Sequence, residues 1–488
     1  MKAPALIVSP PAILSPRKAS IRDWADRFAE ERDRWIEANS FYYEDDLRFM
    51  RFLIPEDLRV LELGCATGHL LAALKPSYGV GVDLSERMIA VARRNHPGLH
   101  FFVGDIEAPG TLEALGGPFD VIVLSDTIGL LEDCESTLRH LHALCTRETR
   151  IVIAYYNRLW GPLLRVGELL RAKMPQQPGH NWLSTDDILG LLNLADHEPI
   201  KRDWRQLIPR SLLGVGRVVN RFIGTLPVIR RACLRNYIVA RPSRNLAHGP
   251  LSASVVVPCR NERGNIEAIV RRVPRVCADL EILFVEGHSK DGTLEEIRRV
   301  IGTCPELDIK VFTQVGEGKG DAVRHGFKHA RGDVLMILDA DMTMPPEALS
   351  KFYRAVVAGK GEFINGSRLV YPMPKQAMRP LNFLANRGFA VLFSWLLNQR
   401  FTDTLCGTKA LTRTSYARIA ANREYFGDFD PFGDFDLIFG AAKLNLKIIE
   451  IPIRYTERTY GETQISRFRH GWLLFQMAVV AYMKLKAL

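Results

Sequence analysis

Two successive series of short apolar runs, each alternating with helical segments, constrain the fold of this chain more than any other feature. The runs have the length of buried strands, and parallel strands need crossover connections of this kind between them. The first series comprises Val60–Leu63, Gly79–Val82, Leu99–Val103, Val121–Leu124 and Ile151–Tyr155, and the second comprises Ser254–Val257, Glu281–Val285, Ile309–Thr313 and Val334–Leu338. The sequence therefore predicts an α/β protein with two doubly wound domains in tandem.

The segment RPSRNLAHGPLS, residues 241–252, separates the two series. It is polar, contains two prolines and a glycine, and breaks both periodicities, so we predict a linker. Near the N-terminus, prolines interrupt the short apolar run, which favours a disordered lead-in over a signal peptide. The expected organisation is a lead-in over residues 1–19, a first domain over 20–240, the linker over 241–252 and a second domain over 253–488.

The net charge of +10 is concentrated in one part of the first domain. Between Lys201 and Arg244, eleven Lys and Arg residues stand against a single acid, Asp203, and apolar residues alternate with them. Runs around 199–203 and 237–240 are expected to close the first sheet as an antiparallel hairpin, with the basic segment at about 205–235 as an insertion. Basic and apolar side chains together favour an anionic membrane surface over nucleic acid as the partner. The alternative is an ordinary amphipathic helix with a solvated basic face.

The eight cysteines and the hydropathy pattern indicate the compartment. None of the cysteines forms a CxxC pair, so neither a zinc site nor a disulfide framework is predicted, and a reducing cytosolic setting is expected. A membrane-spanning helix needs about 20 consecutive apolar residues, and the nearest candidate, Trp472–Met483, has only about a dozen. We therefore expect no transmembrane helix.

The first strand of the first domain leads into VLELGCATGHL, residues 60–70. Gly64 and Gly68 permit close approach of the backbone to a ligand, and the N-terminus of the following helix faces that ligand. Asp83 ends the next strand, 21 residues after Glu62, where its carboxylate suits ribose hydroxyls, and Asp105 ends the third strand. This pattern predicts a nucleotide-like cofactor, and a nicotinamide-binding Rossmann domain is one alternative.

The order Glu-x-Gly-Cys-x-Thr-Gly, VDLSERMIAVAR, GDIE and FDVI, over residues 55–157, resembles class I S-adenosylmethionine-dependent methyltransferases more closely. The resemblance implies a Rossmann-like fold that binds S-adenosylmethionine. It implies that the amino-acid end of this cofactor lies at Glu62, Gly64 and Gly68, the ribose at Asp83 and the adenine amine at Asp105.

The segments after the fourth and fifth strands bear on the methyl acceptor. The fourth strand ends in Ser-Asp-Thr-Ile, residues 125–128, and lacks the Asn/Asp-Pro-Pro-aromatic set that methylates nucleobase amines. This argues against a DNA amine as substrate. Tyr155, Tyr156 and Asn157 follow the fifth strand, where they either line the acceptor pocket or serve packing.

In the second domain, ILDADMTMPPE places Asp339 and Asp341 directly after the strand Val334–Leu338. Two carboxylates at i and i+2 on extended backbone project to the same side. Hard divalent cations such as Mg²⁺ or Mn²⁺ prefer such oxygen ligands, and the metal would neutralise charge on a departing nucleoside diphosphate. Taken alone, an Asp-x-Asp pair is more often a solvated turn.

Three neighbouring segments strengthen the prediction, because each follows a strand where open α/β sheets bind ligands. VVVPCRNERGNI spans residues 255–266, and FVEGHSKDGT spans 284–293. GEGKGDAVRHGF, residues 316–327, is a glycine-rich turn in which Lys319 suits a phosphate at a helix N-terminus.

In this order the segments resemble family 2 glycosyltransferases with the GT-A fold, over residues 252–465, and especially the dolichyl-phosphate mannose synthase-like enzymes. GSRLVYPMPKQAMRPLNFLANRGFAVLF, FTDTLCGTKAL and IIEIPIRYTERTYGETQI follow the layout of that subgroup. The resemblance implies that Pro258, Arg260 and Glu262 line the nucleotide pocket and that Glu286 contacts base or ribose. It implies that Asp339 and Asp341 bind metal and diphosphate. It also implies that Arg458 with the Gly461–Thr463 turn closes over the phosphates.

Three positions depart from the family pattern. Glu286-Gly287 replaces a pair of aspartates, which leaves the base preference open. Thr343 stands where the subgroup has a Gln near the metal, and Gln464 stands where a Lys commonly follows the loop Ser or Thr. The acceptor phosphate is therefore less strongly implied than the donor.

The acceptor decides whether the second domain needs a base. A sugar hydroxyl needs a carboxylate to take its proton, whereas a polyprenyl phosphate is already anionic. In GDFDLIFGAA, residues 433–442, Asp436 is the candidate base, and Asp434 is either functional or an N-cap. Arg379, Arg387, Gly388–Leu397 and Trp472–Met483 are candidates for a membrane-facing side, with core packing as the alternative.

These observations lead to a bifunctional glycan-assembly enzyme at the cytosolic membrane face. Its second domain would transfer a sugar from a nucleotide-sugar donor with inversion to a lipid-linked or glycan acceptor, and its first domain would O-methylate a related glycan. One alternative is a soluble or polymeric hydroxyl acceptor, with Asp436 as base. Others are a first domain that only recruits substrate, and nucleic-acid methylation with the basic segment on phosphates.

Overall fold

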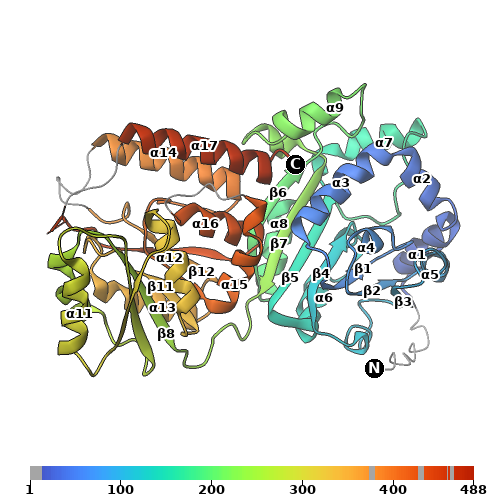
Figure 1. Ribbon diagram of the computed structural model, residues 1–488. Helices are drawn as coiled ribbons and strands as arrows, with labels where there is room; N and C mark the ends of the chain where they lie inside the picture. The colour runs from blue at the N-terminus through green and yellow to red at the C-terminus, as the bar shows by residue number, and fades with distance from the viewer. Residues whose placement is uncertain (1–13, 373–379, 427–432, 459, 462–466) are drawn as a thin grey trace. The chain divides into compact units, whose positions relative to one another are not determined.

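The computed structural model describes residues 14–372, 380–426, 433–458, 460–461 and 467–488 (Figure 1). The chain divides into two compact units, which we call the first and second domains. The first domain runs to Asn245 and includes Lys486–Leu488, and the second runs from Leu246 to Leu485. The division falls inside the segment expected to be a linker.

The first domain contains a seven-stranded sheet in the order β3-β2-β1-β4-β5-β7-β6. β7 is antiparallel to both of its neighbours, as the expected closing hairpin requires, and the other strands are parallel. The strands are β1 Arg59–Leu63, β2 Tyr78–Asp83, β3 His100–Val103, β4 Phe119–Ser125, β5 Cys145–Tyr156, β6 His197–Arg205 and β7 Arg235–Pro242.

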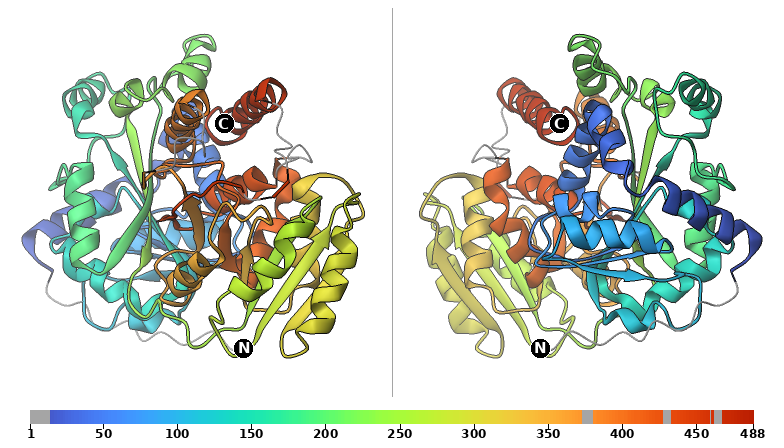
Figure 2. Two further views of the ribbon diagram at one scale, coloured as in Figure 1. Left: turned by 90° about the vertical axis from the view of Figure 1, so that its left-hand side faces the viewer. Right: turned by 90° about the vertical axis from the view of Figure 1, so that its right-hand side faces the viewer.

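Helices cover both faces of this sheet (Figure 2), because successive residues of a strand point to opposite sides. Val60 packs with Phe49 and Met50 on one face, whereas Leu61 packs with Leu138 and Ile188 on the other. The helices are α1 Pro16–Phe28, α2 Arg32–Ala38, α3 Ser40–Leu53, α4 His69–Ala73, α5 Glu86–Asn95, α6 Cys134–His140, α7 Gly161–Leu169, α8 Thr185–Leu194 and α9 Val215–Val218.

Helix α1 begins inside the segment for which we expected a disordered lead-in. The hydroxyl of Ser15 accepts a hydrogen bond from the backbone N–H of Lys18, and Pro16 occupies the first helical position. Both features favour a helix start, because the cap satisfies an unpaired N–H and proline fixes a helical φ. Ile21 and Ala25 are buried, so α1 is part of the fold of the first domain.

The second domain contains a seven-stranded sheet in the order β10-β9-β8-β11-β13-β12-β14. Here β13 is the antiparallel strand, between β11 and β12. The strands are β8 Ala253–Cys259, β9 Leu280–Glu286, β10 Asp308–Thr313, β11 Val334–Ile337, β12 Phe363–Ser367, β13 Lys409–Thr412 and β14 Ile448–Pro452. Together the two sheets confirm the prediction of two doubly wound α/β domains in tandem.

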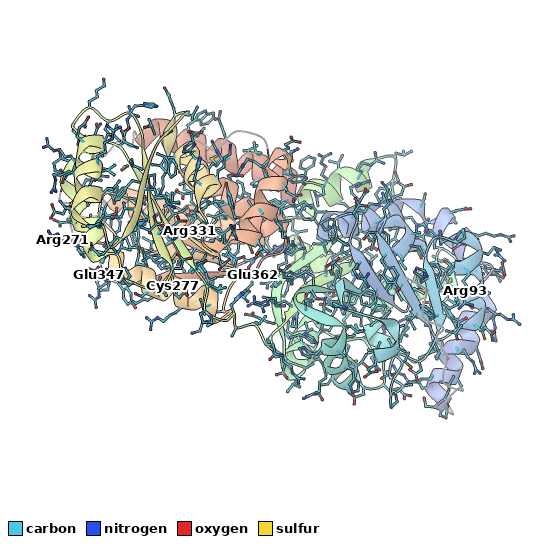
Figure 3. All side chains as sticks on the ribbon, turned by 60° about the horizontal axis from the view of Figure 1, so that its bottom comes forward. Arg93, Arg271, Cys277, Arg331, Glu347 and Glu362 are labelled. Carbon is cyan, nitrogen blue, oxygen red and sulfur yellow. The ribbon has the colours of Figure 1, made fainter. Side chains whose placement is uncertain are left out.

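Side chains fill the space between the sheet and the helices of each domain (Figure 3). In the second domain, α14 and α17 lie side by side (Figure 1), and the rings of Trp395 and Tyr482 stack with centroids 5.6 Å apart. Within the described residues, every helix is too short or too polar to cross a bilayer. The helices are α10 Ile266–Arg272, α11 Thr293–Thr303, α12 Gly318–His329, α13 Leu349–Val357, α14 Pro380–Leu397, α15 Arg413–Ala421, α16 Asp434–Lys443 and α17 Arg467–Leu485.

Candidate active sites

Asp339 and Lys319 form the centre of the candidate site in the second domain. Asp339 follows β11, and Lys319 lies in the first turn of α12; the Lys319 Nζ is 2.6 Å from Asp339 Oδ1. Burial lowers the pKa of Lys319, but the carboxylates of Asp339 and Asp434 outweigh it and hold this pKa above its ordinary value. Lys319 is therefore a cation at neutral pH.

Gly407 closes one side of this ion pair. A Cβ atom at this position would lie 2.1 Å from both Asp339 Oδ2 and Lys319 Nζ, so a larger residue would displace one of them. Gly407 lies two residues before β13, and the antiparallel direction of this strand brings the residue to the carboxyl end of β11. In the sequence, the segment FTDTLCGTKAL was noted only because it follows the layout of the resembled subgroup. This packing role of Gly407 was not predicted.

Asp341 is held by a second cation. Arg458 Nη2 is 2.9 Å from Asp341 Oδ2, and Arg458 Nη1 is 2.9 Å from Glu262 Oε1. The other oxygen of Asp341 accepts hydrogen bonds from the backbone N–H and the hydroxyl of Thr343, at 3.1 and 2.8 Å. Thr343, one of the departures from the family pattern, thus fixes the orientation of the Asp341 carboxylate.

Glu262 follows β8 and Arg458 follows β14, and both belong to the charge cluster around Asp341. Glu262 also accepts a hydrogen bond from Asn265 Nδ2 at 2.7 Å. Burial raises the pKa of Glu262, and Arg458 opposes this shift. The predicted residues Glu262, Asp339, Asp341 and Arg458 therefore meet at the carboxyl edge of the sheet, with Lys319 beside them.

The remaining donor-site predictions have different outcomes. Glu286, the last residue of β9, is buried and its Oε1 accepts a hydrogen bond from the Ser289 N–H at 2.5 Å, so it holds the turn that follows β9. Pro258 is half-buried near the end of β8, and Arg260 is exposed just beyond it. Glu462 and Thr463 of the loop turn, Gln464 and Arg379 lie outside the described residues.

Asp434 and Asp436 occupy different surroundings from those expected. Asp436 Oδ2 is 2.7 Å from Arg423 Nε, so the candidate base forms an ion pair with a helix-flanking cation. Asp434 Oδ1 is 2.9 Å from Lys409 Nζ, whose side chain is fully buried. Gly433, not Asp434, is the N-cap of α16. Of the two acids, Asp434 influences Lys319 electrostatically.

Asp339 and Asp341 are the residues that fit a metal in this domain. Their carboxylates are partly exposed at one strand end and offer the hard oxygen ligands that Mg²⁺ or Mn²⁺ prefers. Within the described chain, three or more His, Cys, Asp or Glu side chains nowhere gather into a metal-binding group.

Glu62, at the end of β1, is the centre of the candidate site in the first domain. Its side chain is 3% exposed, and its Oε2 has no hydrogen-bond partner among the described residues. Burial raises the pKa of Glu62 to about 8. A buried, unpartnered carboxylate oxygen is costly unless a ligand satisfies it, so Glu62 fits the amino group of a cofactor.

The glycine-rich turn lies between β1 and α4. Gly64 and Gly68 have φ values of +77° and +75°, which favour glycine. A Cβ atom on Gly64 would lie 2.3 Å from Thr127 Oγ1, and one on Gly68 would lie 2.6 Å from Phe101 Cζ. Asp83 ties this loop to β2, because its carboxylate accepts hydrogen bonds from the N–H groups of Ala66 and Ser85, both at 2.9 Å.

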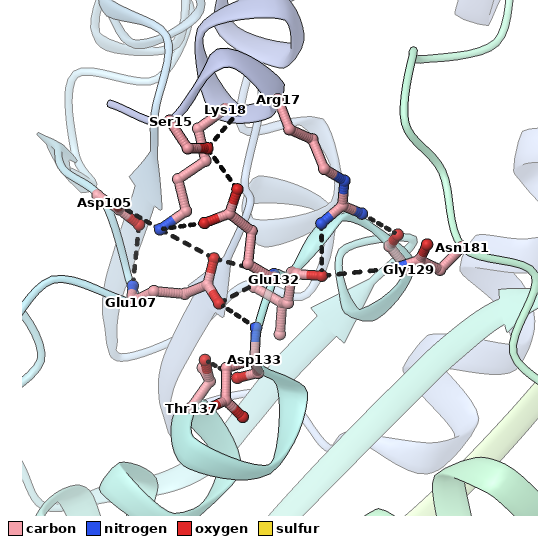
Figure 4. A network of polar contacts seen from close by, with 11 residues as sticks. Ser15, Arg17, Lys18, Asp105, Glu107, Gly129, Glu132, Asp133, Thr137 and Asn181 are labelled. Atoms are coloured by element: carbon pink, nitrogen blue, oxygen red, sulfur yellow. Dashed lines mark hydrogen bonds and ion pairs between the residues drawn. The ribbon is translucent and has the colours of Figure 1, made fainter. Parts of the chain in front are cut away.

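Asp105, the predicted partner of adenine, is bound to the N-terminal helix (Figure 4). Lys18 Nζ is 2.7 Å from Asp105 Oδ2 and 3.0 Å from Glu107 Oε2. Arg17 donates to the carbonyl oxygens of Leu131 and Gly179, at 2.8 and 2.6 Å. These contacts were not predicted from the sequence, because both bases lie in the segment expected to be a disordered lead-in. The Ser-Pro helix start was the available signal.

A buried arginine organises the carboxyl edge beyond β4. Arg235 is 1% exposed, pairs with Asp46 at 3.1 Å and with Asp126, and lies 4.9 Å from the centre of the Tyr156 ring. Tyr156 also accepts a hydrogen bond from the hydroxyl of Tyr42 at 3.0 Å. Tyr156 therefore belongs to a polar cluster at the site edge.

Tyr155, near the end of β5, and Asn157, just after it, hold neighbouring segments in place. Tyr155 donates to Thr185 Oγ1 at 2.8 Å, and Asn157 donates to the carbonyl oxygens of Arg231 and Cys233. The basic segment is also less exposed than its composition suggested. Of the eleven bases between Lys201 and Arg244, four are buried in the first domain: Lys201, Arg205, Arg235 and Arg241.

Comparison with known proteins supplies independent information on both domains. Residues 254–425 match the family described as glycosyl transferase family 2, and residues 28–202 match the family described as methyltransferase domain. An undecaprenyl-phosphate 4-deoxy-4-formamido-L-arabinose transferase of Pseudomonas fluorescens is 25% identical over 230 residues, which are 46% of this chain. A dolichol-phosphate mannosyltransferase of Pyrococcus furiosus is 37% identical over 123 residues, which are 25% of this chain.

The matches cover parts of these proteins. The aligned regions span 63% of the length of the first relative and 34% of the second. Among solved structures, a SAM-dependent methyltransferase of Thermotoga maritima is 20% identical, with a TM-score of 0.35. That similarity covers 45% of this chain and 99% of the other.

Proposed function

Because this chain carries a methyltransferase domain followed by a family 2 glycosyltransferase domain with the GT-A fold, we propose that it is a bifunctional enzyme of glycan assembly. The second domain transfers a sugar from a nucleotide-sugar donor to a polyprenyl phosphate, with inversion at the anomeric carbon. The first domain is an S-adenosylmethionine-dependent O-methyltransferase that acts on a related glycan. The charge cluster around Asp339 and Asp341 is the observation that carries the first part.

The cluster supplies what departure of a nucleoside diphosphate requires. Mg²⁺ or Mn²⁺ held by Asp339 and Asp341 would neutralise negative charge on the leaving group. Lys319 and Arg458 already lie at these two carboxylates, 2.6 and 2.9 Å away, and each presents further N–H donors to phosphate oxygens. Both cations would thus contribute when the diphosphate binds and when it leaves.

The ion pairs of Asp434 and Asp436 support a phosphate rather than a hydroxyl as the acceptor. A hydroxyl acceptor would need a carboxylate base, but Asp436 is held by Arg423 and Asp434 by the buried Lys409. An anionic phosphate oxygen attacks the anomeric carbon without a base, on the face opposite the diphosphate. The names of both relatives, which are polyprenyl-phosphate and dolichol-phosphate transferases, support this choice.

The first domain offers a site that suits a cationic cofactor. S-adenosylmethionine supplies the methyl group on a positively charged sulfonium. Glu62 would meet the ammonium group with its unpartnered oxygen, Gly64 and Gly68 would admit the amino-acid end, Asp83 would hold the ribose and Asp105 the adenine amine. The fusion of the two domains in one chain supports a glycan hydroxyl as the methyl acceptor.

A lipid-linked acceptor implies work at the cytosolic face of a membrane, with the protein bound peripherally. In the second domain, α14 exposes Leu384 and Val391, and α17 exposes Trp472 and Phe475. Such side chains on two adjoining helices support contact with lipid. Arg387, on α14, is exposed among them and suits a phosphate headgroup.

The test of sugar transfer uses the full chain with Mn²⁺ and a panel of nucleotide sugars. Release of nucleoside diphosphate should be stimulated strongly by a short polyprenyl phosphate and should stop when the metal is chelated. Equal release with a free sugar or a glycan hydroxyl, and none with the lipid phosphate, would contradict the acceptor. Calorimetry with S-adenosylmethionine tests the first domain separately, and absence of binding would leave it a recruiting platform.

A further inference from the structure

Two stretches of the first domain expose an unusual amount of apolar surface. They are residues 158–174, which contain α7, and residues 206–234, which contain α9; we call them together the apolar-basic surface. Among the described residues of the first domain, every exposed large apolar side chain except Leu194 lies in one of these stretches. The most exposed are Leu213 at 106%, Leu169 at 85% and Val228 at 82%. This concentration sets the surface apart from scattered exposure, which is normal for soluble domains.

The same two stretches carry most of the net charge of the chain. They contain nine Lys and Arg residues and one acid, Glu168, against a net charge of +10 for the whole chain. Glu168 is paired with Lys173 at 2.6 Å, so its charge is balanced locally. Arg165, Arg171, Arg217 and Arg221 are exposed between the apolar side chains. The charged side chains of the apolar-basic surface are thus almost all positive.

The two stretches are folded and tied to each other. Arg210 Nη2 donates to the carbonyl oxygen of Ala172 at 2.8 Å, and Trp160 Nε1 donates to that of Ala232 at 2.7 Å. Asn220 is buried, where its side chain accepts from Ile208 N–H and donates to the Ile208 carbonyl. The exposed apolar groups are therefore presented by a defined framework.

The surface lies at the same edge of the sheet as the candidate methyl-donor site. One stretch follows the carboxyl end of β5, and the other follows the carboxyl end of β6. β5 and β6 run in the same direction because both are antiparallel to β7. Figures 1 and 2 show α7 and α9 at this end of the domain.

The backbone at the tip of the longer stretch is strained. Leu212 and Leu213 have φ values of +45° and +57°, a conformation that bulky residues rarely adopt. Both side chains are exposed, so core packing gives no reason for a leucine at either position. Strain that the fold itself does not need points to a function for the side chain.

We propose that the apolar-basic surface docks the first domain on an anionic lipid bilayer. The exposed leucines and valines enter the boundary between headgroups and acyl chains, and the arginines between them meet the negative headgroups. Charge complementarity favours an anionic partner, and the aliphatic character favours a bilayer over nucleic acid, which stacks on aromatic side chains. Docking turns the methyl-donor edge toward lipid-linked glycans. The docking itself is independent of either catalytic activity, whereas its benefit for methylation rests on the proposed function.

The test is co-sedimentation of the full chain with vesicles that contain neither polyprenyl phosphate nor donor. The chain should bind vesicles of phosphatidylglycerol and phosphatidylcholine at least tenfold more tightly than pure phosphatidylcholine. Leu169→Glu and Leu213→Glu should each weaken binding about tenfold, because they remove apolar contact and add like charge. Arg217→Gln with Arg221→Gln should weaken it about 30-fold, from the loss of two headgroup attractions.

Matched controls separate docking from folding and from general charge effects. Leu194→Glu, at an exposed leucine outside the surface, should leave binding within twofold, as should Arg27→Gln with Arg87→Gln. Leu213→Gly removes the backbone strain, so it should raise the melting temperature while weakening vesicle binding. The proposal is overturned if Leu169→Glu and Leu213→Glu bind like the parent, if Leu194→Glu weakens binding as much, or if nucleic acid binds more tightly than the vesicles. Nucleoside diphosphate release should persist in all of these variants, which separates this test from that of sugar transfer.

Discussion

The sheets of the two domains begin alike and diverge after their fourth strand. Their first four strands have the same parallel order, β3-β2-β1-β4 in one and β10-β9-β8-β11 in the other. In the first domain β4 is followed by a parallel strand, whereas in the second β11 is followed by the antiparallel β13. Residues at the carboxyl end of β5, such as Tyr156, therefore reach the first site, and residues that precede β13, such as Gly407, reach the second. The direction of the strand next to the fourth one therefore decides which part of the sequence lies beside the candidate site.

The two sites also differ in whether their acidic residues are paired with cations. In the first domain, neither Glu62 nor Asp83 forms an ion pair with a described residue, and burial raises the pKa of both. In the second domain, Asp339 and Asp341 are each held by a cation. Glu62 and Asp83, unlike Asp105 with its partner Lys18, are left without cations and suit a positively charged methyl donor. Acids interleaved with cations suit a diphosphate and its metal. The predictions below test this contrast.

The largest effect is expected from Asp341→Asn in the second domain. The change removes one carboxylate from the proposed metal site and leaves Arg458 with Glu262 alone, so turnover in sugar transfer should fall about 10³-fold. S-adenosylmethionine affinity should stay unchanged, because the site of the first domain keeps all its groups. Measurement of nucleoside diphosphate release alongside calorimetry checks both halves. Full turnover in this variant would remove the basis for a metal-assisted leaving group.

A smaller loss is expected from Gly64→Ala in the first domain. The new Cβ meets Thr127 Oγ1 at 2.3 Å, and φ of +77° is unfavourable for alanine, so the loop must move. S-adenosylmethionine affinity should fall about 10²-fold, with sugar transfer intact. Gly98→Ala is the matched control, because no atom lies within 4 Å of its Cβ. Equal affinity in the two variants would mean that the glycine loop does not contact the cofactor.

Glu62→Gln should separate stability from binding. The folded protein keeps Glu62 protonated up to a pKa of about 8, whereas in the unfolded chain the group ionises near 4.5. Stability is therefore lost as pH rises from about 4.5 to 8, and glutamine, which cannot ionise, avoids the loss. The variant should be more stable than the parent by roughly 3 kcal/mol at pH 7, with no gain at pH 4.

Denaturant unfolding at several pH values, without ligand, measures this gain. The same variant should bind S-adenosylmethionine poorly, because it lacks the carboxylate that meets the ammonium group. In the parent, binding should release a proton near neutral pH, which calorimetry in buffers of different ionisation enthalpy detects. A variant that is less stable than the parent at pH 7 would show that Glu62 is already ionised in the folded protein.

The sequence predicted the frame of both domains because strand periodicity and strand-end motifs are local. Glu62 and Asp83 lie at the ends of their strands, and Asp339 and Asp341 come soon after theirs. Parallel strands place their carboxyl ends at one edge whatever lies between them. The partners of these acids were harder to predict. Lys18 and Arg235 come from segments whose composition indicated a lead-in and a solvated basic insertion, yet both pack beside site residues. Such long-range pairing depends on tertiary packing, which periodicity does not encode.

The smallest effect on catalysis is expected from Asp436→Asn. Asp436 is held by Arg423, and a phosphate acceptor needs no base, so sugar transfer should stay within about threefold of the parent. Asp434→Asn is the matched comparison, because it leaves the fully buried Lys409 without its carboxylate and should destabilise the domain by about 3 kcal/mol. Turnover and thermal unfolding of the two variants, measured with polyprenyl phosphate, check both statements. If Asp436→Asn abolished transfer while leaving the melting temperature unchanged, Asp436 would be a base and the acceptor a hydroxyl, so an acid paired with a cation in the second domain would do more than balance charge.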